Sequence, residues 1–326
     1  MQTSIERIES LKNKILCGEM ITREEALELT EMPLEALTAS ANEIREHFCQ
    51  NGFDICTIVN AKCGTCSEDC KYCAQSAHYH TACEENYPLL STEQLLEQAK
   101  KNASQGILRY SLVTSGKRLS DKEVEKACES IRVIRKETPL EVCVSFGLLK
   151  EEQFRKLKEA GASRVHCNLE SSRRYFPEIC TTHTFDEKIE TLKAAKRAGL
   201  SVCSGGIMGL GETMEDRIDM VLEARSLGVK SVPVNVLNPI PGTPYEKNPV
   251  LTNDELCRMV AIFRFLIPDG AIRLAGGRGL LGDKGERGFL SGANAAISGD
   301  MLTTSGITIK TDMELLQQLG YEVKMQ

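Results

Sequence analysis

The sequence predicts an α/β protein with a (β/α)8 TIM-type barrel and an N-terminal helical cap. The first observation is a recurring unit, in which a polar helical segment ends at a glycine and a short apolar run follows. The unit occurs at Gly106, Gly161, Gly199, Gly228 and Gly270. Glycine suits the left-handed residue just past a helix end. The second observation is the number of apolar runs, about eight in roughly 250 residues, because strands alternating with helices imply a parallel sheet of barrel size.

The first segment of the chain, residues 1–50, is expected to be helical and to cap the barrel. Thr22 and Glu25 have the spacing of a capping box, in which each side chain bonds the other residue's backbone. After Pro33, four apolar residues recur at helical spacing on one face: Leu37, Ala41, Ile44 and Phe48. Residues 51–326 are then expected to form the barrel as a single structural unit.

Eight strands are expected in this unit. In chain order they cover residues 53–61, 107–113, 140–147, 162–169, 200–207, 229–236, 271–277 and 293–299. An open, doubly wound sheet is the alternative, but no G-x-G-x-x-G sequence follows the first strand, which favours the barrel. The active site of a barrel lies at the C-terminal ends of its strands. The cysteine-rich segment directly after the first strand is therefore expected on that face.

The composition excludes several classes of partner. The chain has 326 residues, 41% of them hydrophobic, and a net charge of -6, which argues against a nucleic-acid partner. No apolar run reaches the roughly 18 residues of a membrane span. The N-terminal segment carries charges throughout and has no apolar core, so it is not a secretory signal. We therefore expect a cytoplasmic protein without a membrane or nucleic-acid partner.

The chain contains fourteen cysteines. Without a secretory signal they indicate metal ligands, catalytic thiols or small buried side chains rather than disulfides. Four of them fall within AKCGTCSEDCKYCAQS, at Cys63, Cys66, Cys70 and Cys73. This density predicts a metal site.

Two arrangements of these four cysteines are considered. Cys63 with Cys66 and Cys70 with Cys73 would make two zinc-binding pairs, but structural zinc pairs are usually about a dozen or more residues apart. The other arrangement uses Cys66-x3-Cys70-x2-Cys73, three close thiolates of the kind that hold iron–sulfur clusters. Three protein ligands leave one iron of a four-iron cluster open for chemistry. Four buried thiols without a metal are the remaining alternative.

The second arrangement, with the aromatic Tyr72 before the last cysteine, resembles the motif of the radical S-adenosylmethionine (SAM) superfamily. The resemblance implies that SAM chelates the open iron of a 4Fe-4S cluster and is cleaved by one electron to a 5′-deoxyadenosyl radical.

Longer segments resemble the biotin synthase family. They are NAKCGTCSEDCKYCAQSAHY, VHCNLESS, ICTTHTFDEKIETLKAAKRAGLSVCSGGIMGLGET, VPVNVLNPIPGTP, IRLAGGR and GANAAISGDMLTT. The resemblance runs from about residue 50 to residue 322. It implies insertion of sulfur into dethiobiotin at the cost of two SAM molecules, an electron donor such as flavodoxin or ferredoxin, and a homodimer.

The resemblance also implies site residues. The candidates for binding the cofactor SAM are Tyr72, Asn168, Glu170, Gly205, Gly206 and Glu212. The candidates for binding dethiobiotin are Lys62, Asn168, Asn235, Thr303 and Thr304. Asn168 and Glu170 lie two residues apart on the fourth strand, so both are expected to face inward. An asparagine offers a donor and an acceptor together, which suits the ureido ring.

The family also implies a second, auxiliary cluster with two irons, held by three cysteines and one arginine. Cys143, Cys203 and Arg273 match three of these positions, but Ser111 occupies the fourth, and serine is a poor ligand for soft metals. Either Ser111 binds anyway, or the cluster is absent, or another cysteine builds a different cluster. We expect the third outcome, a four-iron cluster on Cys143, Cys203 and Cys180, with Arg273 as a donor to sulfur.

Cys63 and Cys167 are the weaker alternatives to Cys180. The remaining cysteines are interpreted as small hydrophobic or incidental thiols: Cys17, Cys49, Cys56, Cys83, Cys128 and Cys257. Two other functions stay open. One is a different radical enzyme on this barrel, such as a hydrogenase-cofactor maturase or an amino-acid isomerase. The other is a zinc-stabilised binding module, which iron and zinc analysis would distinguish.

Overall fold

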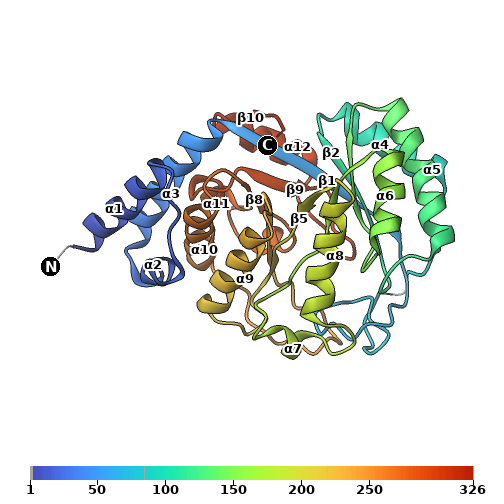
Figure 1. Cartoon of the computed structure of the whole chain (residues 1–326), viewed down its shortest axis with the longest axis horizontal. Coiled ribbons are helices and arrows are strands. Elements are labelled where there is room, and N and C mark those ends of the chain that lie inside the picture. Colours follow the sequence, from blue (N-terminus) through green and yellow to red (C-terminus); the bar gives the residue numbers. More distant parts are fainter. Residues whose placement is uncertain (1–2, 84, 326) are drawn as a thin grey trace.

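The predicted barrel is confirmed in the computed structural model, which describes residues 3–83 and 85–325. Eight parallel strands follow one another around the barrel, and the last pairs with the first and closes it (Figure 1). The strands are β1 (Gly52–Lys62), β2 (Arg109–Thr114), β3 (Glu141–Ser145), β4 (Ala162–His166), β5 (Ser201–Cys203), β7 (Ser231–Val236), β8 (Ala271–Leu274) and β9 (Ala295–Ser298). Each lies within a predicted strand or extends it by one residue at an end.

The fifth predicted strand is interrupted. After β5 the chain bends and continues as β6 (Gly206–Met208), which pairs with β7. Glycine is required at the bend, because a Cβ on Gly205 would collide with the Pro233 carbonyl and one on Gly206 with the Glu170 carbonyl. These close approaches let the backbone after β4 pack directly against β6.

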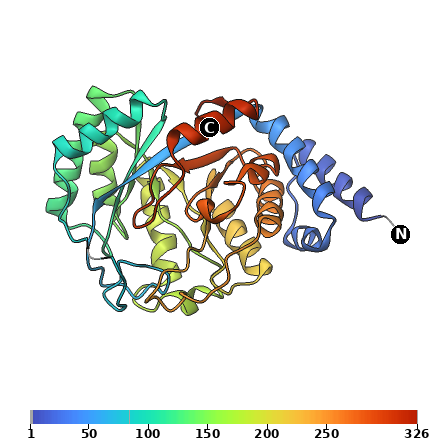
Figure 2. The same ribbon diagram turned by 180° about the vertical axis from the view of Figure 1, so that it is seen from behind.

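Helices surround the barrel, as Figure 2 shows from behind. They are α4 (Thr92–Ser104), α5 (Asp121–Glu137), α6 (Glu151–Ala160), α7 (Phe176–Ile179), α8 (Phe185–Arg197), α9 (Met214–Ser226), α10 (Asn253–Leu266), α11 (Glu286–Leu290) and α12 (Ile309–Gln318), with 3-10 helices at Leu29–Glu31 and Arg278–Leu280. Four of the five glycines that were expected past helix ends have positive φ: Gly106, Gly161, Gly199 and Gly228. Gly270 does not, and its amide instead bonds the Ile267 carbonyl in a turn.

Three helices precede the barrel: α1 (Ser4–Leu16), α2 (Arg23–Glu28) and α3 (Leu34–Cys49). Helix α2 packs against α9 and α10, α3 packs against α10, and α1 packs against α3. The capping box of Thr22 and Glu25 is confirmed. Three of the four predicted apolar residues of α3 are fully buried, whereas Phe48 is 36% exposed, because it lies at the edge of the packed face. The division of the chain at residue 50 stays a prediction.

The C-terminus adds a strand that the sequence did not indicate. β10 (Glu322–Val323) pairs with the start of β1 at Gly52, at the end of β1 away from the cysteine-rich loop (Figure 1). Among the described residues, no helix is both long and apolar enough to cross a membrane.

Candidate active site

The cysteine-rich loop follows β1 and lies at the C-terminal ends of the strands, as expected (Figure 1). Its backbone folds back on itself. The Cys66 amide donates to the Gln75 carbonyl at 2.7 Å, the Ala77 amide to the Cys66 carbonyl at 2.8 Å, and the Cys73 amide to the Cys70 carbonyl at 3.0 Å. The loop is therefore a fixed structure that brings the three cysteines of the expected motif near one another.

Cys63 belongs to a different environment. Its thiol is 2% exposed and donates to the Gln75 side-chain oxygen at 3.2 Å, whereas Cys66 and Cys73 line a cavity. Burial raises the pKa of Cys73 to about 11. A thiol with this pKa ionises at neutral pH only when a metal or another positive charge compensates its burial.

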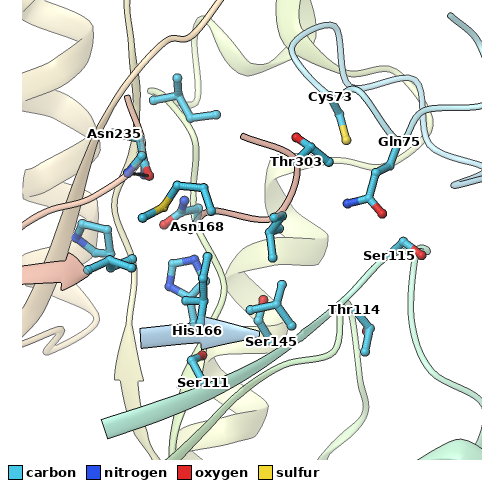
Figure 3. A pocket seen from close by; sticks show the side chains of 18 of the residues that line it. Cys73, Gln75, Ser111, Thr114, Ser115, Ser145, His166, Asn168, Asn235 and Thr303 are labelled. Carbon is cyan, nitrogen blue, oxygen red and sulfur yellow. Dashed lines mark hydrogen bonds between the residues drawn. The ribbon is translucent and has the colours of Figure 1, made fainter. Parts of the chain in front are cut away.

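The cavity has a volume of about 400 Å³ and reaches from the loop into the barrel. Figure 3 shows Cys73 and Gln75 of the loop on one side and Ser111, His166 and Asn168 on the other. A space of this size suits small-molecule ligands.

Asn168 and Glu170 both line this cavity, but they lie beyond the end of β4 at His166. Glu170 has φ 71, a left-handed conformation that is uncommon outside glycine, and the Gly205 carbonyl and Ile207 amide hold its backbone. Its Oε2 is buried without a hydrogen-bond partner. A buried carboxylate oxygen without a partner is suited to accept a hydrogen bond from a hydroxyl group of a ligand.

The other expected cofactor residues are placed differently. Tyr72 lines the cavity, and burial followed by the nearby Glu170 carboxylate raises the pKa of its hydroxyl. Gly205 and Gly206 are not among the described lining residues. Glu212 lies outside the cavity, where its carboxylate accepts from the Gly209 and Leu210 amides and pairs with Arg217 at 2.6 Å. Contrary to expectation, Glu212 therefore stabilises a turn rather than facing the cofactor space.

The expected substrate residues fall into two groups. Asn235, Thr303 and Thr304 line the cavity. The Asn235 side chain donates to the Gly206 carbonyl and accepts from the Gly276 amide, both at 2.9 Å, which leaves one donor and one acceptor site for a ligand. Lys62 is not among the lining residues, since its ammonium pairs with Glu123 of α5 at 2.6 Å.

The floor of the cavity combines thiols with guanidinium groups. These residues come from six strands: Cys56, Arg109, Cys143, Arg164, Cys203 and Arg273. Beneath them Asp54, fully buried, pairs with Arg109 and Arg273, each at 2.9 Å. Although burial opposes it, the charges of Arg273, Arg109 and Arg164 lower the pKa of Asp54 to about 2. Three positive charges against one negative leave the floor with a net positive charge, which suits anionic ligands.

The three floor thiols differ in acidity. Burial raises the pKa of Cys56 to about 12 and also raises that of Cys143. Burial acts on Cys203 too, but a hydrogen bond with His166 and the charges of Arg273 and Arg164 outweigh it and lower the pKa of Cys203 to about 7. Cys203 is therefore the floor thiol that ionises most readily.

Cys180 is not on this floor. It follows α7 and contacts Cys70, to which it is coupled by a thiol–thiol hydrogen bond that lowers the pKa of Cys180 to about 4 and raises that of Cys70. The expectation that Cys180 leans towards Cys203 is wrong, because the chain after β4 carries it out to the cysteine-rich loop. Neither Cys63 nor Cys167 is among the described lining residues of the cavity.

Four residues in the lower part of the cavity were not among the expected site residues: Cys56, Arg109, Arg164 and His166. A signal was present for Cys56, since Asp54 and Cys56 alternate in FDICTIVNA and share the inward face of β1. A charged residue on that face indicated a polar interior. His166 lies two residues before Asn168, and because residues two apart on a strand face the same side, it could also have been expected to point inward.

Known proteins match this combination of barrel and cysteine loop. The Radical SAM superfamily matches residues 62–224, and the Biotin and Thiamin Synthesis associated domain matches residues 233–322. Among solved structures, methylornithine synthase superposes with a TM-score of 0.83 at 20% identity, covering 97% of each chain. A maturase of FeFe-hydrogenase reaches 0.82 at 18% identity, covering 98% of this chain and 75% of its own. At these identities the two structures show the fold alone.

The chain is therefore a radical SAM enzyme on a parallel α/β barrel. The biotin synthase of Brachyspira hyodysenteriae is 56% identical over 319 residues, covering 98% of this chain and 96% of the relative. That of Akkermansia muciniphila is 57% identical over 317 residues, covering 97% and 98%. By this similarity over nearly the whole length, the chain belongs to the biotin synthase family.

Proposed function

We propose that the cavity between the cysteine-rich loop and the barrel floor is where this family's reaction, sulfur insertion into dethiobiotin, takes place. The observation that carries the proposal is that one cavity has loop thiols at one side and floor thiols at the other. Two metal groups and a small substrate can then meet in one enclosed space.

The loop fits a 4Fe-4S cluster. Cys66, Cys70 and Cys73 would hold it, since the backbone hydrogen bonds at Cys66 and Cys73 gather them on one short turn and Cys63 is engaged elsewhere. Such a cluster supplies the electron that cleaves SAM. Around it, Tyr72, Asn168 and the Glu170 carboxylate would orient the nucleoside part of SAM.

Dethiobiotin would lie deeper in the cavity. Asn168 and the remaining donor and acceptor of Asn235 would bind its ureido ring, and the hydroxyls of Thr303 and Thr304 would bind its tail. Lys62 stands beside the lining residue Ser115, whose amide bonds the Lys62 carbonyl at 2.9 Å. On substrate binding, the Lys62 ammonium would leave its ion pair with Glu123 and pair with the substrate carboxylate instead.

For the auxiliary site we propose Cys56, Cys143 and Cys203 as ligands, with Cys56 in place of Cys180. All three line the floor, and the positive floor would compensate the charge of their thiolates. Three thiolates suit a four-iron cluster, and Ser111 beside them is a poor ligand. Such a cluster supplies the sulfur that is inserted.

Arg273 would be a donor to sulfur in this site rather than a ligand. Its guanidinium donates to the carbonyls of Asp54 and Ala296 and pairs with the Asp54 carboxylate. A guanidinium that stays protonated in these contacts can donate to a thiolate, and in that form it has no lone pair for iron.

The experiment is an anaerobic assay with SAM, dethiobiotin and a chemical reductant, in which biotin is the measured product. Formation of biotin by the wild type and its loss in Cys203→Ala, with SAM cleavage retained, is the expected result. Cleavage of SAM without biotin in the wild type would contradict the proposal. We further propose a flavodoxin or ferredoxin as the physiological reductant, a homodimer and a cytoplasmic location. All three are expected from the family.

A further inference from the structure

A second group of metal-binding side chains lies beside the cysteine-rich loop, outside the cavity. The sulfur atoms of Cys70 and Cys180 and a ring nitrogen of His183 lie within 4.8 Å of one another. Cys180 is 3% exposed and His183 is 8% exposed, so the group is shielded from water. The proposed function gives Cys180 and His183 no role in the reaction.

A carboxylate completes the group. The Nδ1 atom of His183 is 2.6 Å from Oε2 of Glu68 and 3.3 Å from the sulfur of Cys180, so these atoms converge. Glu68 is itself buried, and its Oε2 accepts from the Thr182 hydroxyl at 2.9 Å. The carboxylate is therefore held in place whether or not the loop carries a cluster.

We propose that Cys70, Cys180, His183 and Glu68 bind one zinc ion when the chain lacks its four-iron cluster. Two thiolates, an imidazole and a carboxylate are a set of ligands that zinc accepts in tetrahedral sites. At zinc–ligand distances of about 2.0–2.3 Å, tetrahedral ligands lie roughly 3.3–3.8 Å apart. The ligand atoms of Cys70, Cys180 and His183 lie within 4.8 Å of one another, so these three need only small side-chain movements, whereas Glu68 contacts His183 and would move towards the sulfurs on binding.

The charges of the group favour a dication. On binding, both thiols lose their protons to solvent and no atom changes oxidation state. Two thiolates and the Glu68 carboxylate then supply three negative charges against the two of zinc. The neighbouring Lys188, which is buried and also faces Glu170 at 3.7 Å, offsets part of this excess, and the Asp69 carboxylate, which accepts from the Cys180 thiol at 3.1 Å, adds to the negative charge that attracts a dication.

The consequence concerns Cys70, which the proposed function assigns to the four-iron cluster. Cys70 cannot serve both metals, whereas Cys66 and Cys73 face the cavity and take no part in the zinc site. The zinc ion and the cluster therefore exclude one another, and the loop has two alternative metal states.

The test uses the full-length chain, reduced, kept anaerobic and freed of iron with a chelator, with cobalt(II) as a spectroscopic probe and zinc as its competitor. The wild type should bind one equivalent with thiolate-to-cobalt absorption. Glu68→Gln should weaken binding about 10- to 100-fold, and Cys180→Ser should weaken it further, because a ligand is lost. Cys66→Ala is the matched control and should keep wild-type affinity. Circular dichroism verifies that each variant is folded.

A second measurement follows reconstitution with iron and sulfide. Zinc-loaded wild type should incorporate less iron than zinc-free wild type, and Cys180→Ser should incorporate the same amount with or without zinc. Binding that survives in both Cys180→Ser and His183→Phe but is lost in Cys66→Ala would overturn the proposal, since the three loop cysteines would then hold the ion. Neither measurement uses SAM or dethiobiotin, so failure here is distinct from failure of the proposed reaction.

Discussion

Arg273 donates a hydrogen bond to the sulfur of Cys56 over 3.2 Å, inside the barrel and shielded from water. The two residues are 217 positions apart in the chain and lie on β8 and β1. The guanidinium offsets part of the effect of burial, which still raises the pKa of the Cys56 thiol to about 12, and it would stabilise a thiolate once a metal binds. This relationship makes Cys56 a candidate ligand where its sequence context suggested a small buried side chain.

Removal of Cys56 should therefore remove the auxiliary cluster. We expect about eight irons per reconstituted wild-type chain and about four in Cys56→Ala, as two four-iron clusters require. Mössbauer spectroscopy and iron analysis provide the measurement. Ser111→Ala and Cys180→Ala should keep about eight irons each, because neither side chain is a ligand in this arrangement. A two-iron signal that disappears in Ser111→Ala would show that the serine is a ligand after all.

The cysteine-rich loop gives a second prediction. Alanine at Cys66, Cys70 or Cys73 should abolish reductive cleavage of SAM, because the open iron is lost with the cluster. Cys63→Ala should retain most cleavage, since that thiol is bonded to Gln75 and lies apart from the other three. The amount of 5′-deoxyadenosine formed under reducing conditions measures the effect. Retained cleavage in Cys70→Ala would mean that the wrong three cysteines were chosen.

The ion pair of Lys62 and Glu123 leads to a prediction about the substrate. If the substrate carboxylate replaces Glu123, then Lys62→Ala should weaken dethiobiotin binding by roughly 1–3 kcal/mol, because a charged group loses its partner. Glu123→Gln should strengthen binding, since Lys62 is released from a competing charge. Anaerobic titration with dethiobiotin measures both affinities. Equal affinities in the wild type and both variants would exclude Lys62 from the substrate site.

The buried Asp54 predicts a pH dependence of stability. Its pKa of about 2 in the folded chain lies below the usual 3.8, so its contribution is complete above about pH 4 and is lost as the pH falls towards 2. Asp54→Asn should lower the free energy of unfolding by about 3–5 kcal/mol at pH 7, because Arg109 and Arg273 lose a buried counter-charge.

Urea unfolding of the reduced, cluster-free chain at several pH values measures this difference. The difference in the free energy of unfolding between the wild type and Asp54→Asn should become smaller as the pH falls from about 4 to 2. A difference that stays constant over that range would show that the carboxylate charge is not what stabilises the floor. Glu151→Gln, at an exposed pair with Arg197, is the control and should change stability by no more than about 1 kcal/mol.

Much of the fold could be predicted from the sequence because its signals are local. The glycine past each helix end, the capping boxes and the apolar strands depend on neighbouring residues only, and the barrel they predicted is the one observed. The cysteine motif with Tyr72 was also a local signal, because its three thiols must lie on one short loop to share a cluster. Asn168, Asn235, Thr303 and Thr304 follow strand ends or lie near them, and they line the cavity.

The tertiary structure alone decided which distant side chains meet. Cys180 looked close to Cys203 by strand order, but the segment through α7 carries it to Cys70. Cys56 meets Arg273 because the barrel closes between β9 and β1, a contact that no local pattern encodes. Burial and charge in this closed interior set the acidity of each thiol, and both depend on residues from several strands. Local sequence determined the elements and the cluster loop, and closure of the barrel determined the floor beneath them.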